Sequence, residues 1–252
     1  MPPDTPDTVI GKVAVLLRAF EADDHVLSLA ELVRRTGLHK ATVYRLANEL
    51  VTVSLLDRAG GGYRLSGGLF ELGMRASVER SLLELAMPFL QDLYERTHET
   101  VHLGVLDGHE VVYVAKIGGH RQARAPSRAG GRLPLHCTGI GKALLAHGGP
   151  ELRRAVLDQP LPRRTPKTIT QPGALARQLD AIVESGVAFE YEESAIGIAC
   201  VAAPVLDTAS NELLAAISVT GPTTRFRPDA HVTAVRAAAA GIAATLVRRR
   251  AL

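Results

Sequence analysis

The segment LPLHCTGIGKA, residues 133–143, combines a helix start with polar side chains and a cysteine. Thr138 is a common helix-capping residue, and the glycine-rich turn after it leaves backbone N–H groups free at the helix N-terminus. Such N–H groups, at the positive end of a helix dipole, bind carboxylates and phosphates. The GxxxxGK[ST] spacing of a nucleotide-binding P-loop is missing. We therefore interpret the segment as a candidate anion site, although the isolated motif is more typical of a plain capped helix.

A second group of reactive side chains follows in GVAFEYEESAIGIAC, residues 186–200. Glu190, Glu192 and Glu193 occupy a predicted strand and the loop after it, and Cys200 lies on the next strand. Acids that alternate with apolar residues on an edge strand are usually solvated, and a lone cysteine is more often a small core residue than a nucleophile. This stretch alone is therefore equally consistent with a ligand-binding role and with a purely structural role for these side chains.

Two other chemistries remain as alternatives. Cys137 follows His136 directly, which suggests a cysteine enzyme, since a thiol at a helix start can have a lowered pKa. Side chains of adjacent residues normally point apart, however. The same two residues, Cys200 and Glu190 would form a metal or redox site if they converged, but no CxxC or HxxxH spacing is present. We expect neither a catalytic residue nor a bound metal or cofactor.

The third constellation is SLAELVRRTGLHKATVYRLANEL, residues 28–50, which predicts two short helices joined by a tight turn. Ser28 followed by Glu31 is a capping box, and Gly37 is placed to end the first helix. Val43 and Leu46 begin an apolar face on the second helix, and the opposite face is polar and basic. This pattern predicts a helix-turn-helix, whose second helix enters the major groove of DNA. An ordinary helical hairpin with a solvated face is the alternative.

The flanking segments favour the DNA-binding interpretation. An amphipathic pattern over residues 10–20 predicts a third helix under the helix-turn-helix. Short strands at 55–58 and 63–65 around a glycine-rich turn predict a hairpin, placed where a winged helix-turn-helix has its wing. Six Lys/Arg stand against three acids between residues 28 and 64. We expect DNA contacts from these side chains: His39, Lys40, Thr42, Tyr44, Arg45, Arg58 and Arg64.

The remainder of the chain predicts an α+β domain. Strands are expected at 100–106, 110–117, 187–192, 198–206 and 213–220, with helices at 81–97, 139–147, 151–158, 175–185 and 228–250. Pro88 should kink or break the first of these helices. Residues 118–131 read as a loop, with room for an edge strand. We expect three regions: 8–67 as a winged helix-turn-helix, 68–80 as a linker helix and 81–252 as a second domain.

Length and composition limit the class of protein. The 252 residues suggest two domains, 46% of them are apolar, and the net charge is +3. Two cysteines, Cys137 and Cys200, form no disulfide framework and suit a reducing cytosol. The N-terminus has no apolar signal core, and no apolar run approaches the ~20 residues of a membrane span. We therefore expect a soluble cytoplasmic protein that does not bind membranes.

Several of these segments together resemble the IclR family of bacterial transcriptional regulators, over roughly residues 8 to 250. The resemblance rests on the helix-turn-helix sequence above and on YRLSGGLFELG, ETVHLGVLDGHEVVYVAKI, LPLHCTGIGKALLA, GVAFEYEESAIGIACVAAPV and AAISVTGP. It implies a winged helix-turn-helix joined to a GAF-like effector-binding domain. The protein would then be a ligand-responsive regulator that binds operator DNA as a homodimer or a dimer of dimers, with repressor and activator both open.

The resemblance also implies a pocket for a small organic acid. The residues matching Gly139 and Ile140 would supply backbone N–H groups. The full expected effector set is Leu133, Cys137, Thr138, Gly139, Ile140, Glu190, Ile198, Cys200, Ser218 and Thr220. Many relatives have Asp where Glu190 stands and Ser where Thr220 stands, so the extra bulk here predicts a different preferred ligand. They commonly have Ser or Pro where His39 stands, which predicts a weaker helix cap.

Overall fold

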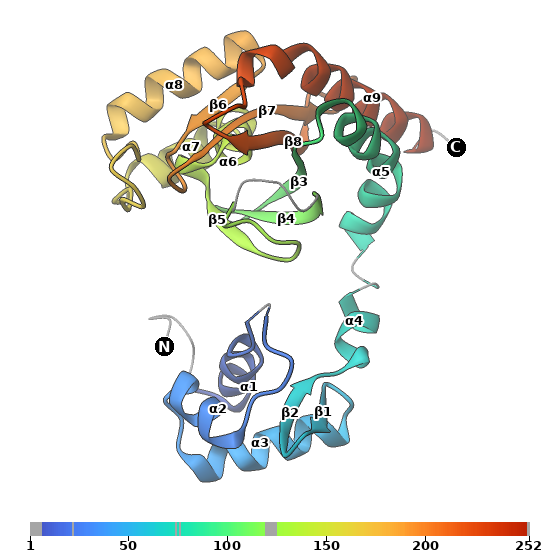
Figure 1. Ribbon diagram of the computed structural model, residues 1–252, viewed down its shortest axis with the longest axis vertical. Helices are drawn as coiled ribbons and strands as arrows, with labels where there is room; N and C mark the ends of the chain where they lie inside the picture. Colours follow the sequence, from blue (N-terminus) through green and yellow to red (C-terminus); the bar gives the residue numbers. More distant parts are fainter. Residues whose placement is uncertain (1–6, 22, 74, 76, 119–124, 251–252) are drawn as a thin grey trace. The chain divides into compact units, whose positions relative to one another are not determined.

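The computed structural model describes residues 7–250 except 22, 74, 76 and 119–124. It divides the chain into two compact units, Met1–Arg80 and Ser81–Leu252 (Figure 1). The predicted α+β class, with helices and an antiparallel sheet, is confirmed.

The first unit is a small helical bundle with a hairpin. It contains α1 (Val9–Arg18), α2 (Leu29–Thr36), α3 (Lys40–Thr52), β1 (Leu56–Ala59) and β2 (Gly62–Leu65). The helices bury one apolar cluster, in which Leu16, Leu32, Val43 and Leu46 are almost fully enclosed. This is the amphipathic spacing expected from the sequence, because residues three and four apart share a helix face.

The hairpin turn depends on two glycines. Gly60 and Gly61 have φ angles of 52° and 79°, which β-hairpin turns of the I′ type require at both central positions. Tyr63 on β2 also exchanges two backbone hydrogen bonds with Leu27, of 2.8 and 2.9 Å, so the segment before α2 joins the hairpin. That pairing ties the hairpin to the helix-turn-helix.

The linker differs from the single helix expected over 68–80. The structure has α4 at Gly67–Gly73 and then α5 at Ser77–Thr97, which crosses residue 80. Gly73 is the last residue of α4, and glycine costs about 1 kcal/mol relative to alanine in a helix interior. Of the kink or break expected near Pro88, the break does not occur, since α5 continues through this residue. Leu82, Ala86 and Leu90 hold this helix in the apolar core on both sides of the proline.

The second unit is built on one six-stranded antiparallel sheet, in the order β5-β4-β3-β8-β7-β6. Its strands are β3 (Thr100–Asp107), β4 (Glu110–Ile117), β5 (Arg132–Pro134), β6 (Ala188–Tyr191), β7 (Ile198–Leu206) and β8 (Leu213–Pro222). The edge strand β5 lies just after the 118–131 loop in which it was considered.

Helices cover both faces of this sheet (Figure 1). One face carries α5 and α9 (Val232–Arg250), which follows the short 3-10 helix η2 (Pro228–His231). The other carries α6 (Gly139–His147), α7 (Pro150–Leu157) and α8 (Pro172–Ser185), with the 3-10 helix η1 (Leu135–Cys137) leading into α6. Because alternate residues of a strand face opposite sides, each strand contributes to two separate cores.

By length and composition, residues Pro228–Arg249 would suffice to cross a membrane, and this is the one such helix within the described residues. The sequence expectation of no such run therefore needs correction. In this fold the helix packs its face of Val235, Ala239 and Ile242 against the sheet and α5.

Close packing of α9 on α5 yields the first prediction. A Cβ added to Gly241 would lie 2.3 Å from the Phe89 ring, far inside van der Waals contact. We expect Gly241→Ala to lower the free energy of unfolding by ~1–3 kcal/mol, although alanine is the better helix former. Gly173→Ala in α8 is the matched control, since its nearest neighbour would be 3.9 Å away. In urea denaturation, the free energy of unfolding should fall for Gly241→Ala and should rise or stay unchanged for Gly173→Ala. Equal free energies of unfolding for the two variants would contradict the packing argument.

Candidate functional site

The N-terminus of α6 is buried against the sheet. Thr138 is its cap, as expected: the Thr138 hydroxyl accepts a hydrogen bond of 3.0 Å from the Gly141 N–H. The next N–H, of Lys142, donates to the Thr138 carbonyl. The N–H groups of Gly139 and Ile140 are the first two of α6 and have no partner one turn earlier within this helix, which begins at Gly139. Two donors thus remain at the positive end of the helix dipole.

Glycine at position 139 permits this close approach. A Cβ there would lie 2.7 Å from the Cys200 sulfur on β7. Any larger residue would push the helix start away from the sheet, so the two donors and the thiol stay near one another only with glycine.

A cavity lies between this helix start and the sheet, with about 270 Å³ of atom-free space that is partly open to solvent. The structure brings nine of the ten expected effector residues to its wall: Leu133, Thr138, Gly139, Ile140, Glu190, Ile198, Cys200, Ser218 and Thr220. Cys137 is fully buried but does not line the cavity. That these residues bind a ligand stays a prediction.

Strand register explains why the polar residues meet. Cys200 pairs with Thr220 on β8 and with Glu190 on β6, and Ser218 pairs with His102 on β3. Directly opposed residues of antiparallel strands point to the same face. Four strands therefore place a polar band on one end of the face that α6 covers.

Glu190 has an unusual environment in this band. It is 3% exposed, and its Oε1 accepts hydrogen bonds from the Ser194 N–H at 2.9 Å and the Ser194 hydroxyl at 2.7 Å. Burial raises the pKa of Glu190 to about 7, against the opposing effect of the Ser194 hydrogen bonds. The buried Lys142 ammonium donates instead to Glu193 at 2.5 Å and to Gln178 at 3.0 Å.

Sequence reasoning missed six lining residues: His102, Tyr113, Ala125, Pro126, Ser127 and Ser194. His102 stands 2.7 Å from the Ser127 hydroxyl and 3.4 Å from that of Ser218. Burial lowers its pKa to about 3, so the imidazole is neutral and offers one donor and one acceptor. The available signal was a polar residue between Val101 and Leu103, on the strand face opposite their apolar one.

The two thiols lack the features of a nucleophile. Cys137 and Cys200 are both buried, and burial raises the pKa of each to about 12. His136, the suggested partner of Cys137, instead places its Nε2 3.0 Å from the Pro162 carbonyl oxygen. Among the described residues no three His, Cys, Asp or Glu side chains are grouped as a metal ion needs.

The polar face of α3 lies in the first unit. His39, Lys40, Tyr44 and Arg45 are exposed there, and Thr42 is half-buried. His39 is the N-cap residue of α3 and makes no side-chain cap hydrogen bond, as its residue type suggested.

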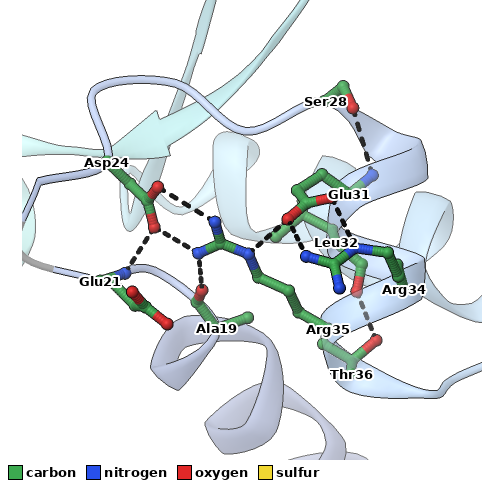
Figure 2. Close-up of polar contacts among 9 residues, drawn as sticks. All are labelled: Ala19, Glu21, Asp24, Ser28, Glu31, Leu32, Arg34, Arg35 and Thr36. Atoms are coloured by element: carbon green, nitrogen blue, oxygen red, sulfur yellow. Dashed lines mark hydrogen bonds and ion pairs between the residues drawn. The ribbon is translucent and has the colours of Figure 1, made fainter.

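An arginine network holds α2 in place beside α1. Figure 2 shows Arg35 of α2 bonded to the Ala19 carbonyl at the end of α1, to Asp24 in the following loop and to Glu31 one turn earlier. Hydrogen bonds from Arg34 and Arg35 lower the pKa of Glu31 to about 2. The positive charges of Arg34 and Arg35 are therefore paired within the unit.

The hairpin arginines face opposite ways. Arg58 pairs across the strands with Tyr63, and Arg64 with Asp57. The Arg64 guanidinium makes an ion pair of 3.1 Å with Asp57, whereas Arg58 reaches Asn48 on α3. Of the two arginines, only Arg58 lies on the side of the hairpin that faces α3.

A helix-turn-helix with a hairpin at the wing position, followed by a separate unit with a cavity partly open to solvent, is the arrangement of a two-domain DNA-binding protein. Known families agree with this class. A model of the IclR helix-turn-helix domain matches residues 9–60, and one of the bacterial transcriptional regulator IclR C-terminal matches residues 74–244. The chain belongs to the IclR family of bacterial transcriptional regulators.

Individual relatives span nearly the whole chain. The regulator BhcR of Paracoccus denitrificans is 36% identical over 89% of this chain and 83% of its own length, and KdgR of Escherichia coli is 35% identical over 90% and 86%. The crystal structure of an IclR homolog from Microbacterium hydrocarbonoxydans, complexed with 4-hydroxybenzoate, superposes with a TM-score of 0.88 at 31% identity, covering 96% of this chain and 100% of that one. The chain is thus an HTH-type transcriptional regulator.

Burial of both thiols yields the second prediction. In the native protein at about pH 8, neither cysteine should react with a disulfide reagent such as DTNB, because a buried neutral thiol is a poor nucleophile. Unfolding in guanidinium should release both thiols at once. Absorbance of the released thiolate measures the count, and a fast-reacting thiol before unfolding would revive the cysteine-enzyme alternative.

Proposed function

We propose that a small organic acid binds in the cavity beside α6 and thereby changes the affinity of the protein for operator DNA. The observation that carries this proposal is the buried start of α6, whose first N–H groups, of Gly139 and Ile140, have no partner within the helix and belong to residues that line the cavity. The related structure complexed with 4-hydroxybenzoate supports the same ligand class.

Each lining group has a role in this proposal. The ligand carboxylate accepts from the two N–H groups, and the hydroxyls of Ser218 and Thr220 donate further hydrogen bonds. Leu133 and Ile198 contact the apolar part of the ligand.

Glu190 narrows the ligand class. An ionised carboxylate in this wall would repel an acid, but with a pKa of about 7 about half of the Glu190 carboxyl groups are neutral at neutral pH. It can then share a hydrogen bond with a hydroxyl of the ligand, which favours hydroxy acids and phenolic acids.

DNA recognition is assigned to α3 and the hairpin. Lys40, Thr42, Tyr44 and Arg45 would face the base edges of the major groove, His39 would lie at the helix start, and Arg58 and Arg64 would lie near phosphates. Ligand binding shifts the DNA equilibrium only through different affinities for two arrangements of the protein. We propose a homodimer, or a dimer of dimers, acting in the bacterial cytoplasm.

A gel-shift titration on the region upstream of its own gene tests the whole proposal. We expect a sequence-specific complex whose midpoint moves when organic acids are added. Failure to form any specific complex, with or without acids, would refute it.

The third prediction concerns Arg45. It forms an exposed ion pair of 2.8 Å with Glu49, a kind of pair worth little, so it can exchange Glu49 for DNA. If Arg45 contacts a base, Arg45→Ala should lower the free energy of DNA binding by ~1–3 kcal/mol and relax specificity at one base position. If Arg45 contacts a phosphate, the variant should instead weaken binding to all sequences and lower the slope of log affinity against log salt by about one. Fluorescence anisotropy across salt concentrations separates the two. Glu49→Ala is the matched control and should not weaken binding; an unchanged Arg45→Ala variant removes this residue from the interface.

The fourth prediction concerns the ligand. Ser218→Ala/Thr220→Val should weaken binding of carboxylic acids roughly a hundredfold or more, because two hydrogen bonds to a charged group are lost, each worth about 1.5–3 kcal/mol. Isothermal calorimetry with a panel of hydroxybenzoates and hydroxy acids measures this. Equal affinities in both proteins would show that the site lies elsewhere, and tight binding of cationic ligands alone would refute the anion argument.

The same titrations have a defined pH dependence. Glu190 is neutral below its raised pKa of about 7 and negative above it, so affinity for an ionised acid should fall between about pH 6 and 8, approaching tenfold per pH unit. Lys142 and Glu193, which lie beside it, form an ion pair of 2.5 Å with one another. Glu190→Gln should bind with little change over this range; an equally steep fall in that variant would assign the titration to another group.

A further inference from the structure

Asn48 lies on the exposed side of α3, one turn after Arg45, where an asparagine would ordinarily be assigned to base reading. An amide recognises adenine by using its oxygen as an acceptor and its NH₂ as a donor together. It is also the only Asn or Gln within Lys40–Thr52. Whether the Asn48 side-chain oxygen is free to accept a hydrogen bond from DNA therefore decides whether α3 can recognise adenine through an amide.

The Asn48 oxygen is already occupied. It accepts one hydrogen bond from the Arg58 guanidinium and another, of 3.3 Å, from the Tyr63 hydroxyl. A carbonyl oxygen has two lone pairs, so both acceptor sites are used. Both donors come from the hairpin, ten and fifteen residues further along the chain.

The Tyr63 ring completes the contact. Its face lies 5.1 Å from the central carbon of the Arg58 guanidinium, within cation–π range. The ring itself is fixed, since Tyr63 is 2% exposed and its backbone pairs with Leu27. Arg58 thus lies on a rigid surface with one N–H group committed to Asn48 and others open to solvent.

We propose that Asn48 is a positioning residue that holds Arg58 of the hairpin for a phosphate contact, and that it does not read a base. The free energy of ordering a long arginine side chain is then spent in the folded protein before DNA arrives. This inference rests on the DNA-binding function proposed above and assigns to one side chain a role in it.

A double-mutant cycle tests the proposal. The DNA is the tightest duplex that the wild-type protein selects from a randomised library, and anisotropy gives affinities across salt concentrations. Arg58→Ala should weaken binding ~3–10-fold for all sequences and lower the salt slope by about one. Asn48→Ala should do the same to a smaller or equal extent, with base preferences unchanged.

The cycle distinguishes the possible outcomes. In the Arg58→Ala background, Asn48→Ala should add almost nothing, because its partner is gone. Arg64→Ala is the matched control: it pairs with Asp57 on the other side of the hairpin, so its effect should add to that of Asn48→Ala.

Additive losses for Asn48 and Arg58, or a relaxed preference at one base in Asn48→Ala, would overturn the proposal. An unchanged salt slope in Arg58→Ala would overturn it as well, even if Asn48→Ala failed to fold. A wild-type protein that enriches no duplex would instead refute the DNA-binding function itself, and this inference with it.

Discussion

The second unit depends on a charge pair buried in its interior. The Lys142 ammonium on α6 is inaccessible to solvent and lies 2.5 Å from a carboxylate oxygen of Glu193 in the loop after β6. Burial raises the pKa of Glu193 against the opposing effect of the lysine. Two charges removed from water gain little net stability from each other, but removing either one is costly because the other is left unpaired.

The position of this pair matters more than its net energy. It ties the helix whose N-terminus borders the cavity to the loop that carries Ser194, the hydrogen-bond partner of Glu190. The same loop is held from the other side by Thr165 and Thr168, whose hydroxyls donate to backbone carbonyls of Glu192 and Glu193. Helix and loop therefore keep a fixed separation, and the cavity wall is rigid where a ligand would be recognised.

Charge is used differently in the first unit, where most basic side chains have acidic partners close in sequence. Glu31 pairs with both Arg34 and Arg35, and Arg45 pairs with Glu49. The excess of Lys and Arg counted in this segment is thus partly neutralised in the free protein. Exposed pairs exchange partners at small cost, whereas the half-buried Arg35 network fixes the angle between the first two helices.

Sequence periodicity predicted most helices and strands, because amphipathic spacing and turn residues act over a few positions. The family resemblance, together with the capped start of α6, and not periodicity, indicated nine of the residues that line the cavity. The contribution of His102 was not predictable in this way, since its contact with Ser218 joins residues 116 positions apart. Strand order and register decide such contacts, and neither is written in local spacing. For the same reason the hydrogen bond from Arg58 to Asn48 could not be predicted, since it depends on how the hairpin packs against α3.

The lengths of the six strands have a consequence for behaviour in a crowded cell. The two edge strands, β5 and β6, contain three and four residues, whereas the four inner strands contain eight to ten. An open sheet edge is a template on which another chain can add a strand and begin aggregation. Short edge strands offer few free backbone groups of their own to a passing chain, which limits the length of any intermolecular strand pairing on β5 or β6.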